Sequence, residues 1–375
     1  MGCPHIPEVD FHEFNERLQQ KRTPILGGVE ITHRCNLNCV HCYCRLPASD
    51  LEAKRAELTF SQICQIIDQI ADEGCLYFTI TGGEPLLRQD FLDIYTYAKK
   101  KGLLISIFTN GTLITPHLAD YLQEWQPLQV EITLYGLTKD TYEKVTRVPG
   151  SYERCIESVK LLLDRGINVA LKTMAMTLNK HEVLEMKRFA KDLGLDFRWD
   201  ALIHPKLDGS KDPYEVRLSK EEVLALELAD EDRVRAVRAY FDKHWDSPLP
   251  ETIYACGAGL LSFFIDPRGH LVMCTLARVP SYDLLAGSFH DGWHNFIPQV
   301  RNRPRTMIGD KCRGCKIAVL CFQCPGRSQL EYGPHAEETP IDYLCELGHM
   351  RMAAYCEHQA VSSQEAGFDF FRRVD

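Results

Sequence analysis

The stretch Thr32-His-Arg-Cys-Asn-Leu-Asn-Cys-Val-His-Cys-Tyr43 contains three cysteines, Cys35, Cys39 and Cys42, with the spacing C-x3-C-x2-C. A loop with this spacing can gather its cysteines at one small site, but it supplies three thiolates, whereas a structural zinc ion or a saturated iron–sulfur cluster takes four ligands. A [4Fe–4S] cluster bound here would therefore keep one iron that has no protein ligand and can bind another molecule. The alternatives are three ordinary loop cysteines, or a zinc site that His41 completes.

A second motif lies about forty residues farther along, where Thr81-Gly-Gly-Glu-Pro85 follows the apolar run Leu76–Ile80. Paired glycines at the end of a strand let backbone N–H and C=O groups approach a ligand closely, which bulkier residues prevent. Glu84 could accept a hydrogen bond from an ammonium group. In isolation these residues are typical of an ordinary strand-to-loop turn, so the motif gains its weight from its position after the cysteine loop.

Together the two motifs resemble those of the radical S-adenosylmethionine (SAM) enzymes, and the resemblance extends from about residue 24 to residue 200. It implies that Cys35, Cys39 and Cys42 hold a SAM-binding [4Fe–4S] cluster and that the GGEP turn binds the methionine amino group. It further implies reductive cleavage of SAM to a 5′-deoxyadenosyl radical, which removes a hydrogen atom from the substrate. Such chemistry needs an electron donor, which we expect to be flavodoxin-like or ferredoxin-like.

Further SAM contacts are expected where neighbouring strands end, because ligand sites in parallel α/β sheets lie at the carboxyl ends of the strands. The resemblance implies that Thr133 contacts the ribose and that Arg147 pairs with the carboxylate. Asn110 is either another contact or a turn residue before a glycine. The expected SAM-binding residues are Gly82, Gly83, Glu84, Pro85, Asn110, Thr133 and Arg147.

Strand and helix patterns alternate over the first two hundred residues. The expected strands are 28–32, 76–80, 103–108, 129–134, 167–174 and 196–199, and the expected helices between them are 59–73, 90–101, 116–123, 152–165 and 180–193. This βα repetition predicts an α/β fold with a parallel sheet. Six units are fewer than the eight that close a TIM barrel, and the family resemblance implies a partial (β/α)6 TIM-like barrel with an open side.

A second set of cysteines occupies the last third of the chain, after an expected hairpin whose turn is Asp266–Gly269. Two CxxC pairs separated by five residues suggest a zinc ribbon, but ribbons usually have longer separations, and a ribbon leaves three cysteines unexplained. The ordered set instead resembles the SPASM extension of peptide-modifying radical SAM enzymes, which carries two auxiliary [4Fe–4S] clusters. Its members are Cys256, Cys274, Cys312, Cys315, Cys321, Cys324 and Cys345.

The SPASM resemblance divides these cysteines between two clusters. One cluster would take Cys312, Cys315, Cys321 and Cys345, and the other would take Cys256, Cys274 and Cys324. The run GAGLLSFFI after Cys256 has no cysteine where sulfatase-maturing relatives have one. The second cluster would therefore have an open iron or a non-cysteine ligand, and an open iron could bind a substrate thiolate. The sequence departs from the family in one spacing, because two residues separate the last CxxC pair instead of three.

Composition excludes several other classes of protein. The net charge of −9, from 43 basic and 52 acidic residues, argues against nonspecific binding to nucleic acid or to anionic membranes. Membrane-spanning runs and a signal peptide are not visible. Sixteen cysteines without an export signal indicate metal ligation in a reducing cytoplasm. The histidines at 290 and 294 have no metal partner that the sequence reveals.

The expected organisation is an N-terminal extension (1–23), a radical SAM partial barrel (24–200), a bridging region (201–250), a SPASM-like domain (251–358) and a tail (359–375). SPASM-bearing enzymes most often modify ribosomally made peptides, which implies crosslinking, thioether formation or a related oxidation here. The extension is too short for a folded leader-recognition domain, so we expect a separate recognition protein or direct recognition. The alternatives are radical modification of a tetrapyrrole or other small molecule, and a non-catalytic iron–sulfur electron-transfer or scaffold protein.

Overall fold

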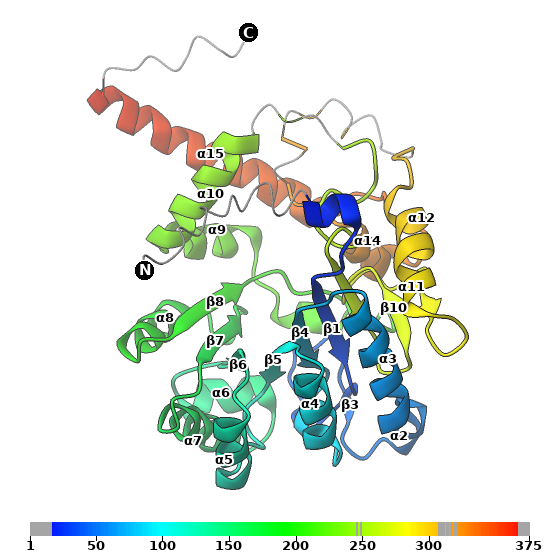
Figure 1. Cartoon of the computed structure of the whole chain (residues 1–375). Helices are drawn as coiled ribbons and strands as arrows, with labels where there is room; N and C mark the ends of the chain where they lie inside the picture. The colour runs from blue at the N-terminus through cyan, green and yellow to red at the C-terminus, as the bar shows by residue number, and fades with distance from the viewer. Residues whose placement is uncertain are drawn as a thin grey trace, which may run out of the picture.

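The computed structural model describes residues 17–244, 247, 250–306, 312, 315, 317–318 and 321–366, with side chains as far as residue 355. Six neighbouring strands pair in parallel across one sheet (Figure 1): β1 (Leu26–Glu30), β4 (Tyr77–Thr81), β5 (Leu104–Thr109), β6 (Gln129–Thr133), β7 (Val169–Met174) and β8 (Asp196–Asp200). Their bounds lie within two residues of the expected ones. The sheet keeps two free edges, so the partial barrel with a parallel sheet is confirmed.

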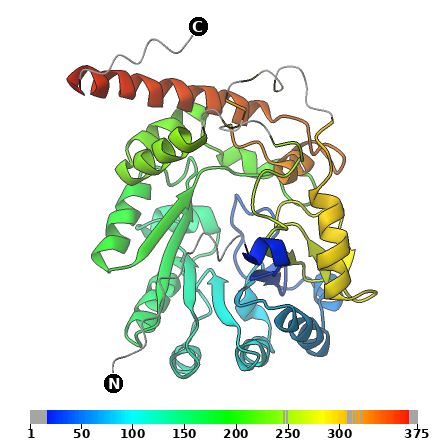
Figure 2. The same cartoon turned by 45° about the horizontal axis from the view of Figure 1, so that its top comes forward.

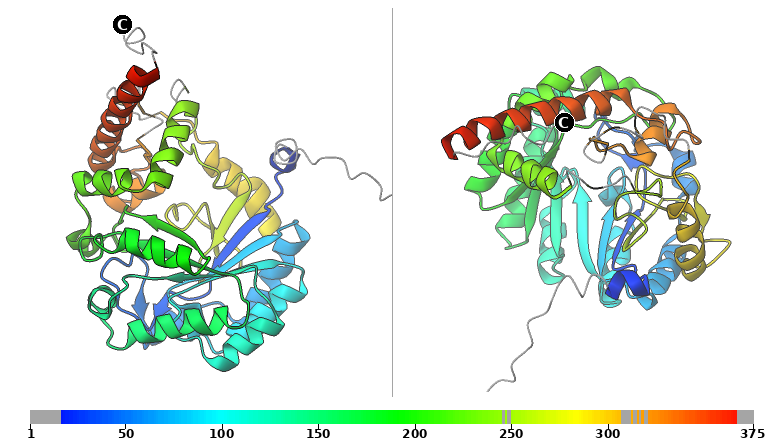
Figure 3. Two further views of the ribbon diagram at one scale, coloured as in Figure 1. Left: turned by 90° about the vertical axis from the view of Figure 1, so that its left-hand side faces the viewer. Right: turned by 90° about the horizontal axis from the view of Figure 1, so that it is seen from above.

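Helices cover the outer face of this curved sheet, as the view from above shows (Figure 3). The expected ones are α3 (Phe60–Asp72), α4 (Phe91–Lys100), α5 (Pro116–Glu124), α7 (Ser151–Leu163) and α8 (Val183–Asp192). The capping box that Thr59 and Gln62 predict at the start of α3 is present. Two helices were not expected, α2 (Leu51–Ala56) and α6 (Lys139–Thr146). The first buries no residue, and the second buries Tyr142 and Val145 together with two threonines, so neither shows a clear apolar period.

Side chains alternate between the two faces of the sheet. Ile105 and Ile107 of β5 and Val130 and Ile132 of β6 are buried in the core beneath the helices. The residues between them point to the opposite, concave side, where they are only partly buried. We call this concave side the lumen. It is the open interior of the partial barrel, and its rim is formed by the carboxyl ends of the parallel strands.

The C-terminal hairpin continues the same sheet beyond β1. Strands β9 (Ser262–Ile265) and β10 (His270–Val272) pair antiparallel around the expected turn, and β11 (Tyr282–Asp283) follows. The turn is held by the Asp266 carboxylate, which accepts the N–H groups of Arg268 at 2.8 Å and His270 at 2.9 Å. We did not expect the parallel pairing of β9 with β1, where Gly27 lies opposite Phe263. It places the C-terminal segment directly beside the strand that leads into the cysteine loop.

The bridging region and the C-terminal helices lie over the top of the barrel (Figure 2). They are η2 (Asp212–Val216), α9 (Lys220–Leu228), α10 (Glu231–His244), α14 (Pro325–Tyr332) and α15 (Asp342–Ala366). Arg351 of α15 makes a bidentate ion pair with the buried Glu227 of α9, at 2.6 and 2.8 Å. Within the described ranges, every helix is too short or too polar to cross a bilayer. The five-part division of the chain stays a prediction, and residues 1–16 and 367–375 lie outside the described residues.

Candidate active site

The cysteine loop begins directly after β1. Its first cysteine lies in the short strand β2 (Arg34–Cys35), which pairs with β3 (Leu46–Pro47). Cys35 is buried, and Cys39 and Cys42 are partly buried. Burial raises the pKa of the Cys35 thiol to about 12, with a further contribution from Glu84. A charge on Cys42 raises the pKa of both other thiols, which places the three cysteines in one electrostatic environment.

Among the described residues, the three cysteines and His41 are not arranged as a site for a single ion. Sulfurs that share one zinc lie about 4 Å apart, because each Zn–S bond is about 2.3 Å long. In the described part of the chain, the one group of three ligand side chains with all ligand atoms within 4.8 Å of one another contains neither a cysteine nor His41. The cysteines of a [4Fe–4S] cluster bind different irons and lie farther apart. The structure therefore gives the zinc alternative no support, and the binding of a cluster by these cysteines stays a prediction.

The glycines of the GGEP turn contact the backbone of the cysteine loop. The Gly83 N–H donates to the Thr32 carbonyl at 2.7 Å, and the Glu84 N–H donates to the Arg34 carbonyl at 2.8 Å. A Cβ on Gly82 would lie 2.2 Å from the Thr32 oxygen, and one on Gly83 would lie 2.4 Å from the oxygen of residue 33. The close approach that the paired glycines permit is thus between two loops of the protein, which fixes the position of the cysteines.

Glu84 is fully buried and joins three segments of the site. Its carboxylate accepts the Thr109 hydroxyl at 2.8 Å, the Asn110 N–H at 2.8 Å and the Leu86 N–H at 3.0 Å, where it caps the short helix η1 (Pro85–Leu87). Burial raises the pKa of Glu84 to about 7, against the opposing effect of these hydrogen bonds. In this structure the carboxylate therefore holds the GGEP turn against the end of β5.

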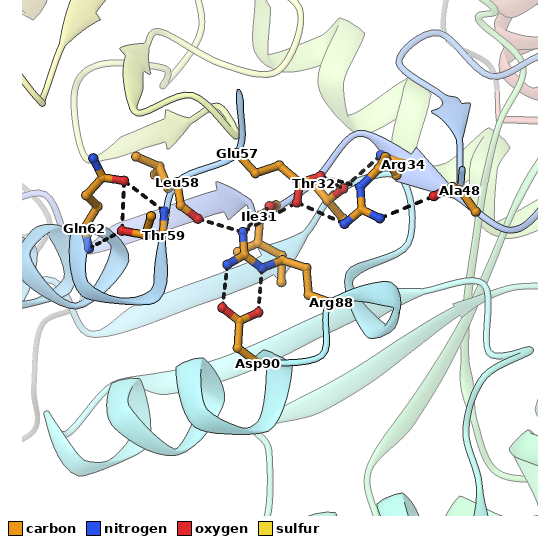
Figure 4. A network of polar contacts seen from close by, with 10 residues as sticks. All are labelled: Ile31, Thr32, Arg34, Ala48, Glu57, Leu58, Thr59, Gln62, Arg88 and Asp90. Carbon is orange, nitrogen blue, oxygen red and sulfur yellow. Dashed lines mark hydrogen bonds and ion pairs between the residues drawn. The ribbon is translucent and has the colours of Figure 1, made fainter. Parts of the chain in front are cut away.

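A network of charged side chains supports the loop from below (Figure 4). Arg34, the neighbour of the first cysteine, makes a bidentate contact with the buried Glu57 at 2.7 and 3.0 Å. Arg88 donates to the carbonyls of Ile31 at 3.1 Å and Leu58 at 2.9 Å. It also pairs with Asp90 at 2.6 Å. Bidentate arginine contacts fix both distance and orientation, so the end of β1 and the segment before α3 form one rigid base.

The remaining expected SAM contacts lie at different distances from the cysteines. The Asn110 side-chain amide donates to Asn36 Oδ1 at 2.9 Å and lies 3.7 Å from the Cys35 sulfur. Arg147 is exposed and ends α6 in a left-handed conformation. The two residues before it accept backbone hydrogen bonds from the cysteine loop. Thr133 ends β6 on the lumen side. Asn110 and the end of α6 thus meet the cysteine loop.

A charged cluster lies on the lumen wall, and sequence reasoning missed it. Glu131 of β6 pairs with Lys172 of β7 at 3.4 Å and with Arg198 of β8 at 2.5 Å. The Lys172 ammonium also lies 3.3 Å from the centre of the Phe108 ring, a cation–π contact. Burial lowers the pKa of Lys172 to about 7, and Glu131 opposes that shift. The sequence offered one sign of this cluster, because Lys172 is a lone charged residue in the mostly apolar segment Val169–Met174.

A second buried acid links the C-terminal segment to the site. Glu30, at the end of β1, pairs with Arg278 at 2.7 Å and with His33 at 3.2 Å. Burial alone would raise the pKa of Glu30, but the hydrogen bonds and charges of His33 and Arg278 lower it to about 2. The Tyr43 hydroxyl, beside the last cysteine of the loop, donates to the same carboxylate at 3.4 Å. The segment after β10 is therefore tied to the cysteine loop.

The C-terminal cysteines come together in two places. The four cysteines that we expect to share one cluster line a single cavity of about 300 Å³. They are Cys312, Cys315, Cys321 and Cys345, and Gln323 and His349 also line this cavity. Of the other set, Cys274 is close enough to Cys324 and Cys256 for their charges to raise its pKa, although burial is the larger cause. Cys256 is exposed, and Arg301 lies beside it. A fourth ligand for this second set is not evident among the described residues.

A three-thiol loop, locked to a glycine turn at the carboxyl edge of a partial barrel, is the arrangement expected of an iron–sulfur enzyme with an open iron. Residues 29–192 match the family described as the Radical SAM superfamily, so the chain carries a radical SAM domain. This domain makes the chain an enzyme and implies one [4Fe–4S] cluster and SAM. The non-catalytic scaffold alternative is therefore set aside.

Relatives and solved structures resemble the chain well beyond this domain. The AdoMet-dependent heme synthase of Methanosarcina barkeri is 25% identical, over 84% of this chain and 95% of that protein. The mycofactocin maturase MftC of Mycobacterium tuberculosis is 28% identical, over 80% of each chain. The crystal structure of Streptococcus suis SuiB bound to precursor peptide SuiA has a TM-score of 0.63 at 16% identity, over 89% of this chain and 82% of that one. The last likeness shows the shared fold.

Proposed function

We propose that this chain uses a SAM-derived radical to modify a ribosomally made peptide, by crosslinking, thioether formation or a related oxidation. The observation that carries the proposal is the cysteine loop, locked to the GGEP turn at the rim of an open lumen with a charged wall. The mycofactocin maturase and the peptide-bound SuiB structure support a peptide as the substrate class.

The chain's own residues would divide the work at this rim. Cys35, Cys39 and Cys42 would hold the SAM-binding cluster; when bound, the cluster and SAM supply the one-electron cleavage that makes a hydrogen-abstracting radical. SAM itself would be bound by Gly82, Gly83, Glu84, Pro85, Asn110, Thr133 and Arg147. Lys172 lies opposite Thr133 in the β6–β7 pairing and contacts Phe108, so both would contact the substrate and limit the access of water.

Two auxiliary [4Fe–4S] clusters complete the proposal. One would be held by Cys312, Cys315, Cys321 and Cys345, whose shared cavity supports this grouping. The other would be held by Cys256, Cys274 and Cys324, with a substrate thiolate or a non-cysteine group as its fourth ligand. These clusters would accept the electron that a substrate radical releases when a new bond to it forms.

The proposed partners follow from the same chemistry. A flavodoxin-like or ferredoxin-like protein would deliver the electron, and the peptide would be presented by a separate recognition protein or recognised directly by this chain. We propose a cytoplasmic location, because thiolate-bound clusters are retained in a reducing compartment.

A second candidate is the modification of a tetrapyrrole. The specific observation in its favour is the heme synthase relative, because the alignment spans 95% of that protein. Basic side chains such as Lys172 and Arg198 in the lumen could bind the carboxylates of a tetrapyrrole as well as those of an acidic peptide.

The test is anaerobic purification and reconstitution, followed by iron analysis and an assay for 5′-deoxyadenosine under reductant. We expect about twelve irons per chain, and about eight in the Cys35/Cys39/Cys42→Ala triple variant. SAM cleavage should be lost in that variant. Mass spectrometry after incubation with candidate precursor peptides or an iron tetrapyrrole then separates the two substrate classes. Cluster without any SAM cleavage would overturn the proposal.

A further inference from the structure

A separate cluster of metal-ligand side chains lies on the outside of the barrel. From the sequence we expected no metal partner for His290 and His294, but the structure places Glu73 beside both. The Glu73 carboxylate lies 2.6 Å from His290 Nδ1 and 2.9 Å from His294 Nε2. Glu73 is the C-cap of α3, 217 and 221 residues away along the chain, which is why no spacing motif could reveal it.

The ligand atoms have the proximity that a single ion requires. One ring nitrogen of each histidine and one carboxylate oxygen all lie within 4.8 Å of one another. Two histidines and one carboxylate form a common ligand set for zinc, which binds at about 2.0–2.2 Å from each nitrogen or oxygen. The His290 side chain is 69% exposed and the other two are 28% and 23% exposed, so solvent can occupy the remaining coordination positions.

The backbone beneath the histidines is firmly anchored. His290 lies in α11 (Phe289–Asp291) and His294 in the π-helical turn η3 (Gly292–Phe296). Trp293, between the histidines, is fully buried, stacks on Phe289 and packs edge-on against Phe263. The Phe289 N–H also donates to the Gln69 side chain of α3 at 2.7 Å. Both histidines are therefore held against α3 before any ion binds, which lowers the entropic cost of binding.

Among the described residues, the ion-pair partners of the Glu73 carboxylate are the two histidines. The groups that lower the pKa of Glu73, against the opposing effect of burial, are His294 and His290. The nearby Asp291 is engaged with the Tyr282 hydroxyl at 2.6 Å and the Asn295 amide at 2.6 Å. Among the ion pairs recorded for the described residues, Glu73 has no lysine or arginine partner, so a cation can take the place of the two hydrogen bonds.

We propose that Glu73, His290 and His294 bind one Zn²⁺ ion, which joins the end of α3 to the segment that follows the C-terminal hairpin. The ion would replace the two histidine–carboxylate hydrogen bonds with three coordinate bonds. It would thereby hold the C-terminal segment on the radical SAM barrel, at a position remote from the cysteine loop. The proposal does not depend on the peptide-modifying function.

The test uses the full chain with its iron–sulfur clusters reconstituted, so that the cysteines do not compete for zinc. Wild type, a His290→Ala/His294→Ala variant and a His117→Ala/His181→Ala control are treated with a mild chelator, dialysed against Zn²⁺ and analysed for zinc and iron. The control removes two exposed histidines that lie elsewhere. We expect about one tightly bound zinc per chain in wild type and control. The site variant should bind zinc at least about tenfold more weakly, with its iron content unchanged.

X-ray absorption at the zinc edge identifies the ligands. A shell of nitrogen and oxygen at about 2.0–2.2 Å supports the site, whereas sulfur at about 2.3 Å means that zinc occupies cysteines. A Glu73→Gln variant, which keeps the size of the side chain, should also weaken binding if the histidine variant folds poorly. Equal zinc binding by wild type and both site variants, or a sulfur shell, would overturn the proposal. Absence of zinc from wild type would mean that these residues form ion pairs only.

Discussion

The two cysteine regions of this chain are supported in different ways. The loop after β1 is held by the protein itself: backbone hydrogen bonds tie it to the GGEP turn, and Glu57 and Arg88 secure its base. The cysteines at 312, 315, 321 and 345 instead surround a cavity of about 300 Å³, and Cys321 donates to the Ala318 carbonyl at 3.2 Å. Among the described residues, the first region is held by hydrogen bonds between protein groups, whereas the four thiols of the second region line a shared cavity.

This difference indicates where metal binding and folding are coupled. When a site is preformed, removal of the metal removes chemistry and leaves the fold. When thiols line a cavity that protein groups do not fill, the metal supplies part of the folding free energy, as in small zinc domains. We expect the barrel loop to behave in the first way and the C-terminal cysteines in the second.

The largest expected effect is a loss of SAM cleavage that leaves the fold intact. Replacing Cys35, Cys39 and Cys42 together with alanine should lower SAM cleavage by more than about 100-fold, which exceeds the usual effect of losing an outer contact to a metal site. The melting temperature should change little, because the backbone hydrogen bonds that tie the loop to the GGEP turn do not use the thiols. Chromatography of 5′-deoxyadenosine and circular dichroism measure the two effects. A variant that loses its helical signal would contradict the preformed scaffold.

The next effect is local unfolding of the C-terminal region. A Cys312→Ala/Cys345→Ala variant should lose the auxiliary cluster that we propose for these cysteines and gain fast amide exchange across residues 321–345. Exchange in β4 and β5 should remain slow, because the core beneath α3 and α4 does not involve those cysteines. Hydrogen exchange read by mass spectrometry compares the two regions in one sample. Equal protection of 321–345 in variant and wild type would show that this region also folds without its metal.

Local patterns predicted the strands, most of the helices and the cysteine loop, and the family resemblance implied the partial barrel, but contacts between distant residues stayed hidden. The strands and most of the helices follow from apolar runs and capping residues, which are legible in a window of a few residues. The pairing of Glu30 with Arg278 spans 248 residues, and that of Glu73 with His290 spans 217. The parallel pairing of β9 with β1 belongs to the same class. These features arise only when the chain folds, and they tie the two regions together.

Adding one methyl group to a glycine in each region compares the two cysteine regions with a smaller change. In Gly83→Ala the new Cβ would lie 2.4 Å from the residue 33 oxygen and 2.5 Å from the Arg34 oxygen, so the loops must move apart. We expect a loss of about 1–3 kcal/mol in the free energy of unfolding, together with weaker SAM binding. Gly257→Ala, beside the first C-terminal cysteine, is the matched control, since its Cβ would meet no atom within 4 Å. Thermal melts with an iron count compare the pair, and similar losses in both variants would remove the proposed distinction.

The smallest effect concerns the lumen wall, where a partly buried lysine tests how polar the surroundings of the cysteine loop are. Lys172 is 21% exposed, and its pKa is lowered to about 7 by burial. Between about pH 7 and the ordinary lysine pKa near 10.5, the unfolded chain binds the proton that the folded chain has released, so stability should rise with pH in that window. Lys172→Met removes this dependence. At pH 7 the variant should have a free energy of unfolding about 1 kcal/mol higher than that of wild type. The substitution does not leave Glu131 unpaired, because Arg198 remains its partner.

The advantage of Lys172→Met should shrink as the pH approaches 10, whereas Lys54→Met, at an exposed position of α2, should follow wild type throughout. Urea unfolding read by pulse proteolysis at pH 7, 8 and 9 measures the free energy of unfolding of the three proteins. If this free energy changes with pH in the same way for Lys172→Met and wild type, the lumen contains enough water for the lysine to titrate normally. A lumen of that kind would solvate a charged substrate instead of confining it. In that case the contrast between a rigid barrel site and a metal-dependent C-terminal site would hold for the cysteine loop but not for the wall beside it.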